Sequence, residues 1–88
     1  MSSTAQWVGI DVSKTTLDIA LRPSQEQLQV PNTESGVASL CKPLSAFSIQ
    51  QVVIEATGGL EQLVAFALHQ RGMTVSVINP RQGRDFAS

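Results

Sequence analysis

The feature that most restricts the fold of this chain is the shortness of the turns between its first three strand-like segments. Residues 7–12, 17–21 and 27–30 are apolar or alternate between apolar and polar, and only a few polar residues separate one segment from the next. A parallel crossover between strands needs a dozen or more residues. Connections this short therefore predict an antiparallel meander of three strands.

The second half of the chain alternates between helical and strand patterns. Apolar residues recur at helical spacing within residues 37–44 and 60–68. Residues 51–55 and 74–78 predict two further strands, the first of them buried on both faces, and Pro80 favours a third helix over residues 81–88. The order β-β-β-α-β-α-β-(α) predicts a mixed α/β sheet with crossover connections.

The two helical segments carry signals at their ends. Residues 32–35, from Asn32 to Ser35, are a start signal for the first helix, and Pro43 is expected to kink or loosen its last turn. Arg71 and Gly72 favour the end of the second helix. Trp7, at the start of the first strand, is expected to anchor the core or its rim.

Composition limits the size of the protein and the kinds of site that it can hold. The chain has 88 residues, a formal net charge of −1, one cysteine and one histidine. This length predicts a single domain over residues 1–88, and we expect the domain to be truncated because the third helical pattern has no stop signal. The near-neutral charge excludes nucleic-acid binding by bulk charge. The single Cys41 and His69 exclude a disulfide framework and argue against a thiolate or imidazole metal centre.

No segment of the sequence has the pattern of a membrane anchor or of a secretory signal. No apolar run approaches the roughly 20 residues that span a bilayer. The first residues, MSSTAQW, lack the basic and apolar regions of a signal peptide. We therefore expect a cytoplasmic protein without a membrane partner.

Two acidic residues stand at the ends of apolar strand segments. Asp11 ends the first segment and Glu55 ends the fourth. If these strands are parallel neighbours, their carboxyl ends meet at the sheet edge where α/β proteins bind ligands. Two carboxylates at one edge favour Mg²⁺ or Mn²⁺, the ions that promote attack on phosphodiesters. A simpler interpretation fits the spacing too: Asp11 shapes a turn, and Glu55 favours the dipole of the next helix.

Three sequence motifs follow one another along the chain. They are VGIDVSK with LDIA in residues 8–20, VIEATGG in residues 53–59, and VINPRQ with RDFA in residues 77–87. Together they resemble the DEDD-type transposases of the insertion-sequence 110 family and the related Piv-type DNA invertases. The resemblance covers residues 7–88. It implies a ribonuclease-H-like (RuvC-like) fold with helices packed on a mixed sheet of strand order 3-2-1-4-5, in which the first and fourth strands are neighbours.

The resemblance also implies a chemistry. The catalytic set of that family is Asp, Glu, Asp and Asp, of which the first maps onto Asp11 and the second onto Glu55, as catalytic and metal-binding residues. Asp85 matches neither of the remaining acids, so this part of the protein is expected to be inactive alone. For the full-length protein the resemblance implies Mg²⁺- or Mn²⁺-dependent DNA strand cleavage in transposition and recombination. It further implies a non-coding guide RNA and homo-oligomerisation.

Other polar residues are candidates for contacts with nucleic acid. Ser13 and Lys14 form the turn beside Asp11, and Arg81 and Arg84 form a small basic patch near the C-terminus. These residues also fit the simpler interpretation of solvated polar side chains. Asp18 alternates with apolar neighbours, so we expect it to point away from the site unless its strand is displaced.

Two other functions stay open at this point. An ATP-binding domain of the actin, sugar-kinase and Hsp70 type shares the same core and a Gly-Ile-Asp strand. In that class a glycine-rich turn approaches the phosphates, whereas residues 12–16 contain no glycine. A non-catalytic domain for assembly or RNA docking is the third possibility, because only half of the acidic set is present.

Overall fold

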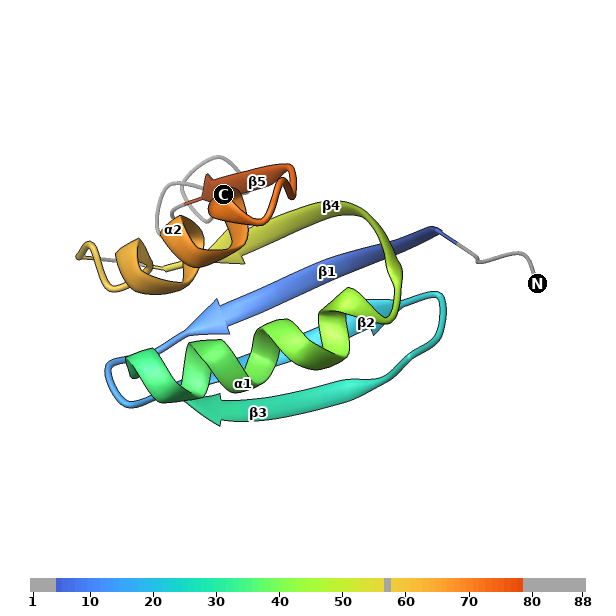
Figure 1. The fold of residues 1–88 in the computed structure, drawn as a ribbon. Helices are drawn as coiled ribbons and strands as arrows, with labels where there is room; N and C mark the ends of the chain where they lie inside the picture. Colours follow the sequence, from blue (N-terminus) through green and yellow to red (C-terminus); the bar gives the residue numbers. More distant parts are fainter. Residues whose placement is uncertain (1–4, 57, 79–88) are drawn as a thin grey trace, which may run out of the picture.

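Within the part of the chain that the structure describes, five strands form one mixed sheet, and two helices cover one of its faces (Figure 1). The structure is a computed structural model that describes residues 5–56 and 58–78. Its elements are β1 (Ala5–Val12), β2 (Thr16–Arg22), β3 (Gln27–Pro31), α1 (Glu34–Ser45), β4 (Ser48–Glu55), α2 (Gln62–Gln70) and β5 (Val75–Ile78). The strand order β3-β2-β1-β4-β5 confirms the order that the family resemblance implied. The predicted third helix lies outside the described residues.

The first three strands form the predicted antiparallel meander. β1 pairs antiparallel with β2, and β2 pairs antiparallel with β3. The backbone N–H of Ser13 donates to the carbonyl of Thr16 at 2.9 Å, which closes the first turn. The N–H of Gln25 donates to the carbonyl of Leu21 at 2.8 Å in the second turn. Short turns thus set both pairings, as the sequence indicated.

The two crossover connections place β1 beside β4. Both β1 with β4 and β4 with β5 pair in parallel. Because α1 carries the chain from β3 past β2 and β1, the fourth strand joins the free side of β1. In Figure 1 the arrowheads of β1 and β4 point to the same edge of the sheet. The residues that end these two strands therefore lie at one rim.

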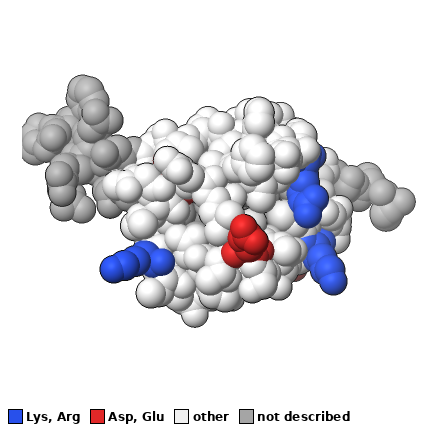
Figure 2. Space-filling view, turned by 60° about the vertical axis from the view of Figure 1, so that its left-hand side comes forward, with Lys and Arg blue, Asp and Glu red and all other residues white. Residues whose placement is uncertain are grey.

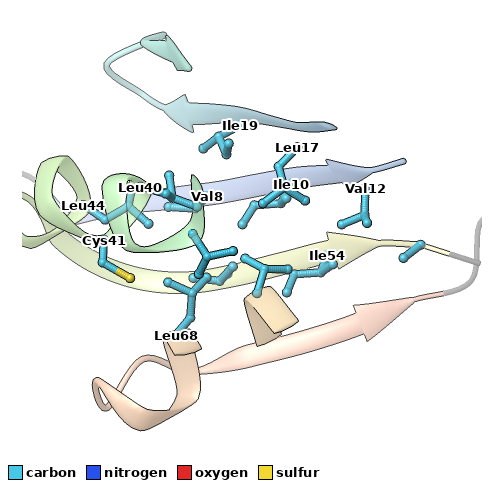
Figure 3. Packing of buried hydrophobic residues seen from close by; sticks show 14 of the residues in the cluster. Val8, Ile10, Val12, Leu17, Ile19, Leu40, Cys41, Leu44, Ile54 and Leu68 are labelled. Carbon is cyan, nitrogen blue, oxygen red and sulfur yellow. The ribbon is translucent and has the colours of Figure 1, made fainter. Parts of the chain in front are cut away.

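The hydrophobic core fills the space between the sheet and the two helices (Figure 3). Alternate strand residues face the helices, as the period of a β-strand requires. The buried hydrophobic side chains of the strands are Val8, Ile10, Val12, Leu17, Ile19, Leu21, Val52 and Ile54. They meet Val37, Leu40, Cys41 and Leu44 from α1 and Val64 and Leu68 from α2. The opposite face of the sheet carries neither helix, and we call it the open face.

One expectation about β4 was wrong. The apolar run of residues 51–55 predicted a strand buried on both faces, but only Val52 and Ile54 are buried, while Val53 is partly exposed and Glu55 is exposed. The reason is that α1 and α2 pack on the same face, so the side chains of β4 that alternate with Val52 and Ile54 lie on the open face.

Helix α1 begins with a side-chain cap and a close contact with β3. The hydroxyl of Thr33 accepts a hydrogen bond from the N–H of Gly36 at 3.1 Å. Gly36 is buried, and a Cβ atom at this position would collide with the carbonyl of Pro31. Pro43, expected to kink or loosen the last turn, lies inside the helix, which continues to Ser45. The missing side chain at residue 36 thus lets the helix lie against the end of β3.

Helix α2 ends at a glycine, as the sequence predicted. Arg71 is the C-cap and Gly72 follows it with φ +83°. The N–H of Gly72 donates to the carbonyl of His69 at 3.0 Å, and that of Met73 donates to Leu68 at 3.2 Å. This pair of bonds is the Schellman motif, which requires a left-handed residue where glycine stands. Neither α1 nor α2 is long and apolar enough to cross a bilayer.

Candidate functional site

A row of polar side chains crosses the open face at the rim where β1 and β4 end. Asp11 is opposite Glu55 in the parallel β1–β4 pair and opposite Asp18 in the antiparallel β1–β2 pair. Asp18 is in turn opposite Gln29 of β3. All four side chains are exposed. The order across the sheet is therefore Gln29, Asp18, Asp11 and Glu55.

The strand period explains why Asp11 and Glu55 share a face. Ile10 and Val12 are buried towards the helices, so Asp11 between them points to the open face. Glu55 follows buried Ile54 in the same way. Neighbouring strands lie about 4.8 Å apart, which places these two residues side by side at the carboxyl end of parallel strands. The structure thus brings together the two acids that the sequence singled out.

Asp18 belongs to the same row, which the sequence analysis missed. We expected it to approach the site only if β2 were displaced, yet β2 is regularly paired and Asp18 stands directly opposite Asp11. Its Oδ1 accepts a hydrogen bond from Nε2 of Gln29 at 2.7 Å. The signal was present in the turn: a hairpin with residues 13–16 between its last paired residues pairs Val12 with Leu17, and hence Asp11 with Asp18.

The turn that carries Ser13 and Lys14 extends directly beyond Asp11. The hydroxyl of Ser13 lies 3.0 Å from the carbonyl oxygen of Thr16 and accepts from the Thr16 N–H at 3.0 Å. Ser13 is exposed, and its hydroxyl stabilises the turn through these two contacts. Lys14 is exposed next to it. Arg81 and Arg84 lie outside the described residues.

A hollow of about 560 Å³ lies on the open face, beside the acidic row. Its lining includes Asp11, Asp18 and Glu55 at the rim and the small residues Gly9 and Ala20 further along β1 and β2. A Cβ atom on Gly9 would meet nothing within 4 Å, so the hollow is open above this residue.

The end of the open face away from the acids carries an aromatic and a cationic side chain. Trp7, which we expected to anchor the core or its rim, is 52% exposed and stands opposite Arg22 in the β1–β2 pair. The face visible in Figure 2 is mostly uncharged, with a few Lys or Arg and Asp or Glu side chains on it. Because the formal net charge of the chain is only −1, the acidic row is a local charge feature on a weakly charged protein.

The carboxylate oxygens of the row are the type of ligand atom that a hard divalent cation prefers. Carboxylate oxygens are the ligands that Mg²⁺ and Mn²⁺ prefer, and Mg²⁺ is commonly held by one or two carboxylates with several waters. Within residues 5–56 and 58–78, no group of three or more His, Cys, Asp or Glu residues is arranged to hold a metal ion. Asp11 and Glu55 therefore fit a cation as a two-carboxylate site, to which further ligands must be added.

Comparison with known proteins gives a family match and similarity to solved structures. The model of a transposase family, the DEDD transposases of insertion-sequence 110 type, matches residues 8–88. No curated protein matches the chain. Among solved structures, a Ppx/GppA family protein from Aquifex aeolicus is similar with a TM-score of 0.42 and 14% identity. That match covers 89% of this chain, which spans 36% of the length of the Aquifex protein.

Proposed function

This chain belongs to the DEDD transposases of the insertion-sequence 110 family, and from that membership we propose that residues 1–88 are the N-terminal part of a catalytic domain that cleaves DNA strands in transposition. The family is ribonuclease-H-like, and the five-stranded sheet agrees with it. The observation that carries the proposal is the register pair of Asp11 with Glu55 at the carboxyl rim of parallel strands. We assign these two positions to the first two acids of the family's catalytic set.

Asp11 and Glu55 are the residues proposed to hold Mg²⁺ or Mn²⁺. When bound, such an ion supplies Lewis-acid stabilisation of the charge that develops on a DNA phosphate. The role of the chain itself is to hold both carboxylates exposed and adjacent, on strands whose ladder fixes their backbones. Asp18 adds a third negative charge beside Asp11, and the amide of Gln29 keeps that carboxylate in place.

DNA is the proposed substrate, and the cationic groups would contact its phosphates. Lys14 extends from the turn that follows Asp11, within reach of a backbone that lies across the rim. Arg81 and Arg84 are proposed as further phosphate contacts. The family resemblance adds a non-coding guide RNA and a second copy of the protein as proposed partners.

Two acids are too few for efficient cleavage. We therefore expect cation binding in residues 1–88 but cleavage only in a longer protein. Residues 1–88 are expected to bind Mn²⁺ weakly and to leave DNA intact, because the other two acids of the set have no match in the family motifs found here. A longer protein that also contains the third and fourth acids of the family's catalytic set is expected to cleave. In that protein Asp11→Asn or Glu55→Gln removes a charged ligand while keeping the shape of the side chain.

A Mn²⁺ titration of the 88-residue chain followed by NMR tests the proposal directly. Paramagnetic broadening is expected first at Asp11 and Glu55, and Asp11→Asn is expected to abolish it. Glu26→Gln is the matched control, because it removes one exposed carboxylate at the β2–β3 turn, away from the row. Broadening that is spread evenly over all exposed acids, or that survives Asp11→Asn, would refute the metal site.

A further inference from the structure

Asn32 occupies a junction that no catalytic motif includes. It lies between the end of β3 at Pro31 and the capping residue Thr33 of α1, and it is partly buried. In the sequence it indicated only the start of a helix. In the structure its polar groups turn towards two other loops.

The hydrogen bonds of Asn32 connect segments that are distant in sequence. Its backbone N–H donates to the carbonyl of Thr15 at 2.9 Å. Its side-chain Nδ2 donates to the carbonyl of Ser13 at 3.0 Å and to the carbonyl of Leu60 at 3.4 Å. A carboxamide nitrogen carries two hydrogens, so it can serve both carbonyls at once. One side chain therefore joins the β1–β2 turn (residues 13–15) to the β4–α2 loop (residues 56 and 58–61).

These two segments are the ones that leave the acidic row. The last register pair of β1 with β4 is Asp11 with Glu55. Beyond this pair, β1 continues into the β1–β2 turn, which carries Lys14, and β4 continues into the β4–α2 loop. The ladder between the strands fixes the backbones of the acids, but it does not extend to these segments. The side-chain amide of Asn32 links the β1–β2 turn to the β4–α2 loop, beyond the end of the β1–β4 ladder.

We propose that Asn32 is a positioning residue, which holds the β1–β2 turn and the β4–α2 loop at a fixed spacing around Asp11 and Glu55 so that a nucleic-acid phosphate meets both segments together. The proposal rests on the proposed function, since it assigns the phosphate to the same rim. The hydrogen bonds of Asn32 within the described residues go to Thr15, Ser13 and Leu60, and none goes to the acids themselves. Its loss is therefore expected to affect phosphate binding while cation binding at the acids persists.

The test compares Asn32→Ala with Thr33→Ala in the 88-residue chain. Thr33→Ala is the matched control, because it removes the cap of α1 one residue away and leaves the bonds to Ser13 and Leu60 in place. ¹⁵N relaxation without ligand is the first measurement. In Asn32→Ala, mobility is expected to rise in residues 13–15 and 59–61 together, whereas Thr33→Ala is expected to change neither segment. Unchanged relaxation in both segments of Asn32→Ala would overturn the proposal.

The second measurement is affinity for a short single-stranded DNA oligonucleotide in the presence of Mn²⁺. Asn32→Ala is expected to weaken this binding about fivefold, the effect of one net hydrogen bond, with Mn²⁺ affinity unchanged. Equal DNA affinity of Asn32→Ala and the original chain would overturn the positioning role alone. Absence of DNA and Mn²⁺ binding in the original chain would instead overturn the proposed function, and with it this extension.

Discussion

The row of three carboxylates predicts that replacing Asp11 by Asn makes the folded protein more stable. Asp11 has a negatively charged neighbour on each side, Asp18 in β2 and Glu55 in β4, in register with it. Like charges directly opposite each other across a sheet destabilise it. Asn has nearly the same shape as Asp, so the substitution removes repulsion with little change in packing.

The register pairs allow the magnitude to be worked out. Strands are spaced about 4.8 Å apart, and two exposed carboxylates about 6 Å apart in water repel by about 0.7 kcal/mol. Asp11 takes part in two such pairs, so Asp11→Asn should raise the free energy of unfolding by about 1.4 kcal/mol at low salt. Asp18 and Glu55 each have one charged neighbour in the row, so Asp18→Asn and Glu55→Gln should each gain about half as much.

Thermal and urea unfolding at two salt concentrations measure this effect. In a domain of this size, about 1.4 kcal/mol corresponds to a rise in Tm of about 5–10 °C. At about 1 M NaCl the screening length falls to about 3 Å, so most of the gain should disappear. A stability gain that is equal at low and high salt would show that charge repulsion is not its cause.

The order of the three variants is the sharper criterion. A row with Asp11 in the middle requires the gain from Asp11→Asn to exceed the gains from Asp18→Asn and Glu55→Gln. If Asp11→Asn destabilises the chain, or gains no more than the flanking variants, the three side chains do not form this row. A site that stays charged at the expense of stability is expected where a cation or substrate group is to be bound.

Three further predictions concern the core, the helix contact and the alternative function. Gly36→Ala should lower stability by about 1–3 kcal/mol in urea unfolding, because the added methyl collides with the carbonyl of Pro31, whereas Gly9→Ala has open space and should be nearly neutral. Leu40→Ala, at a fully buried position, should cost about 2–5 kcal/mol in the same assay; a loss under about 1 kcal/mol would contradict the packing of α1 on the sheet. ATP with Mg²⁺ should leave Tm no higher than Mg²⁺ alone, and a selective rise with ATP would favour the nucleotide-binding alternative.

The meander, the helix faces and the helix ends could be predicted from local sequence. Short turns cannot span a parallel crossover, so the pairing of β1 with β2 and of β2 with β3 followed from their length. The spacing of Val37 and Leu40 predicted the buried face of α1, and Gly72 predicted the end of α2. These features depend on residues close together in the chain, where backbone geometry leaves few alternatives.

The candidate site could be predicted only in part. Asp11 and Glu55 were singled out by their places at strand ends, and the family motifs supported them. Asp18 was assigned away from the site, because alternation gives the face of a residue within its own strand but not its neighbour across the hairpin. Asn32 was assigned to a helix start, because nothing near it in sequence indicates that its amide reaches Ser13 and Leu60.

The sequence by itself determined the apolar faces of the helices, the strand segments of the meander and where the chain turns, because strand and helix periods act over a few residues. The family resemblance implied that β4 lies beside β1, but no local pattern determined this neighbour, and the tertiary structure decided it. Only the tertiary structure decided that both helices cover one face and that Asp18 and Asn32 join the rim of Asp11 and Glu55. The physical reason is that these arrangements are contacts between segments far apart in the chain. They are selected by the burial of the shared core as a whole and not by the preferences of any one segment.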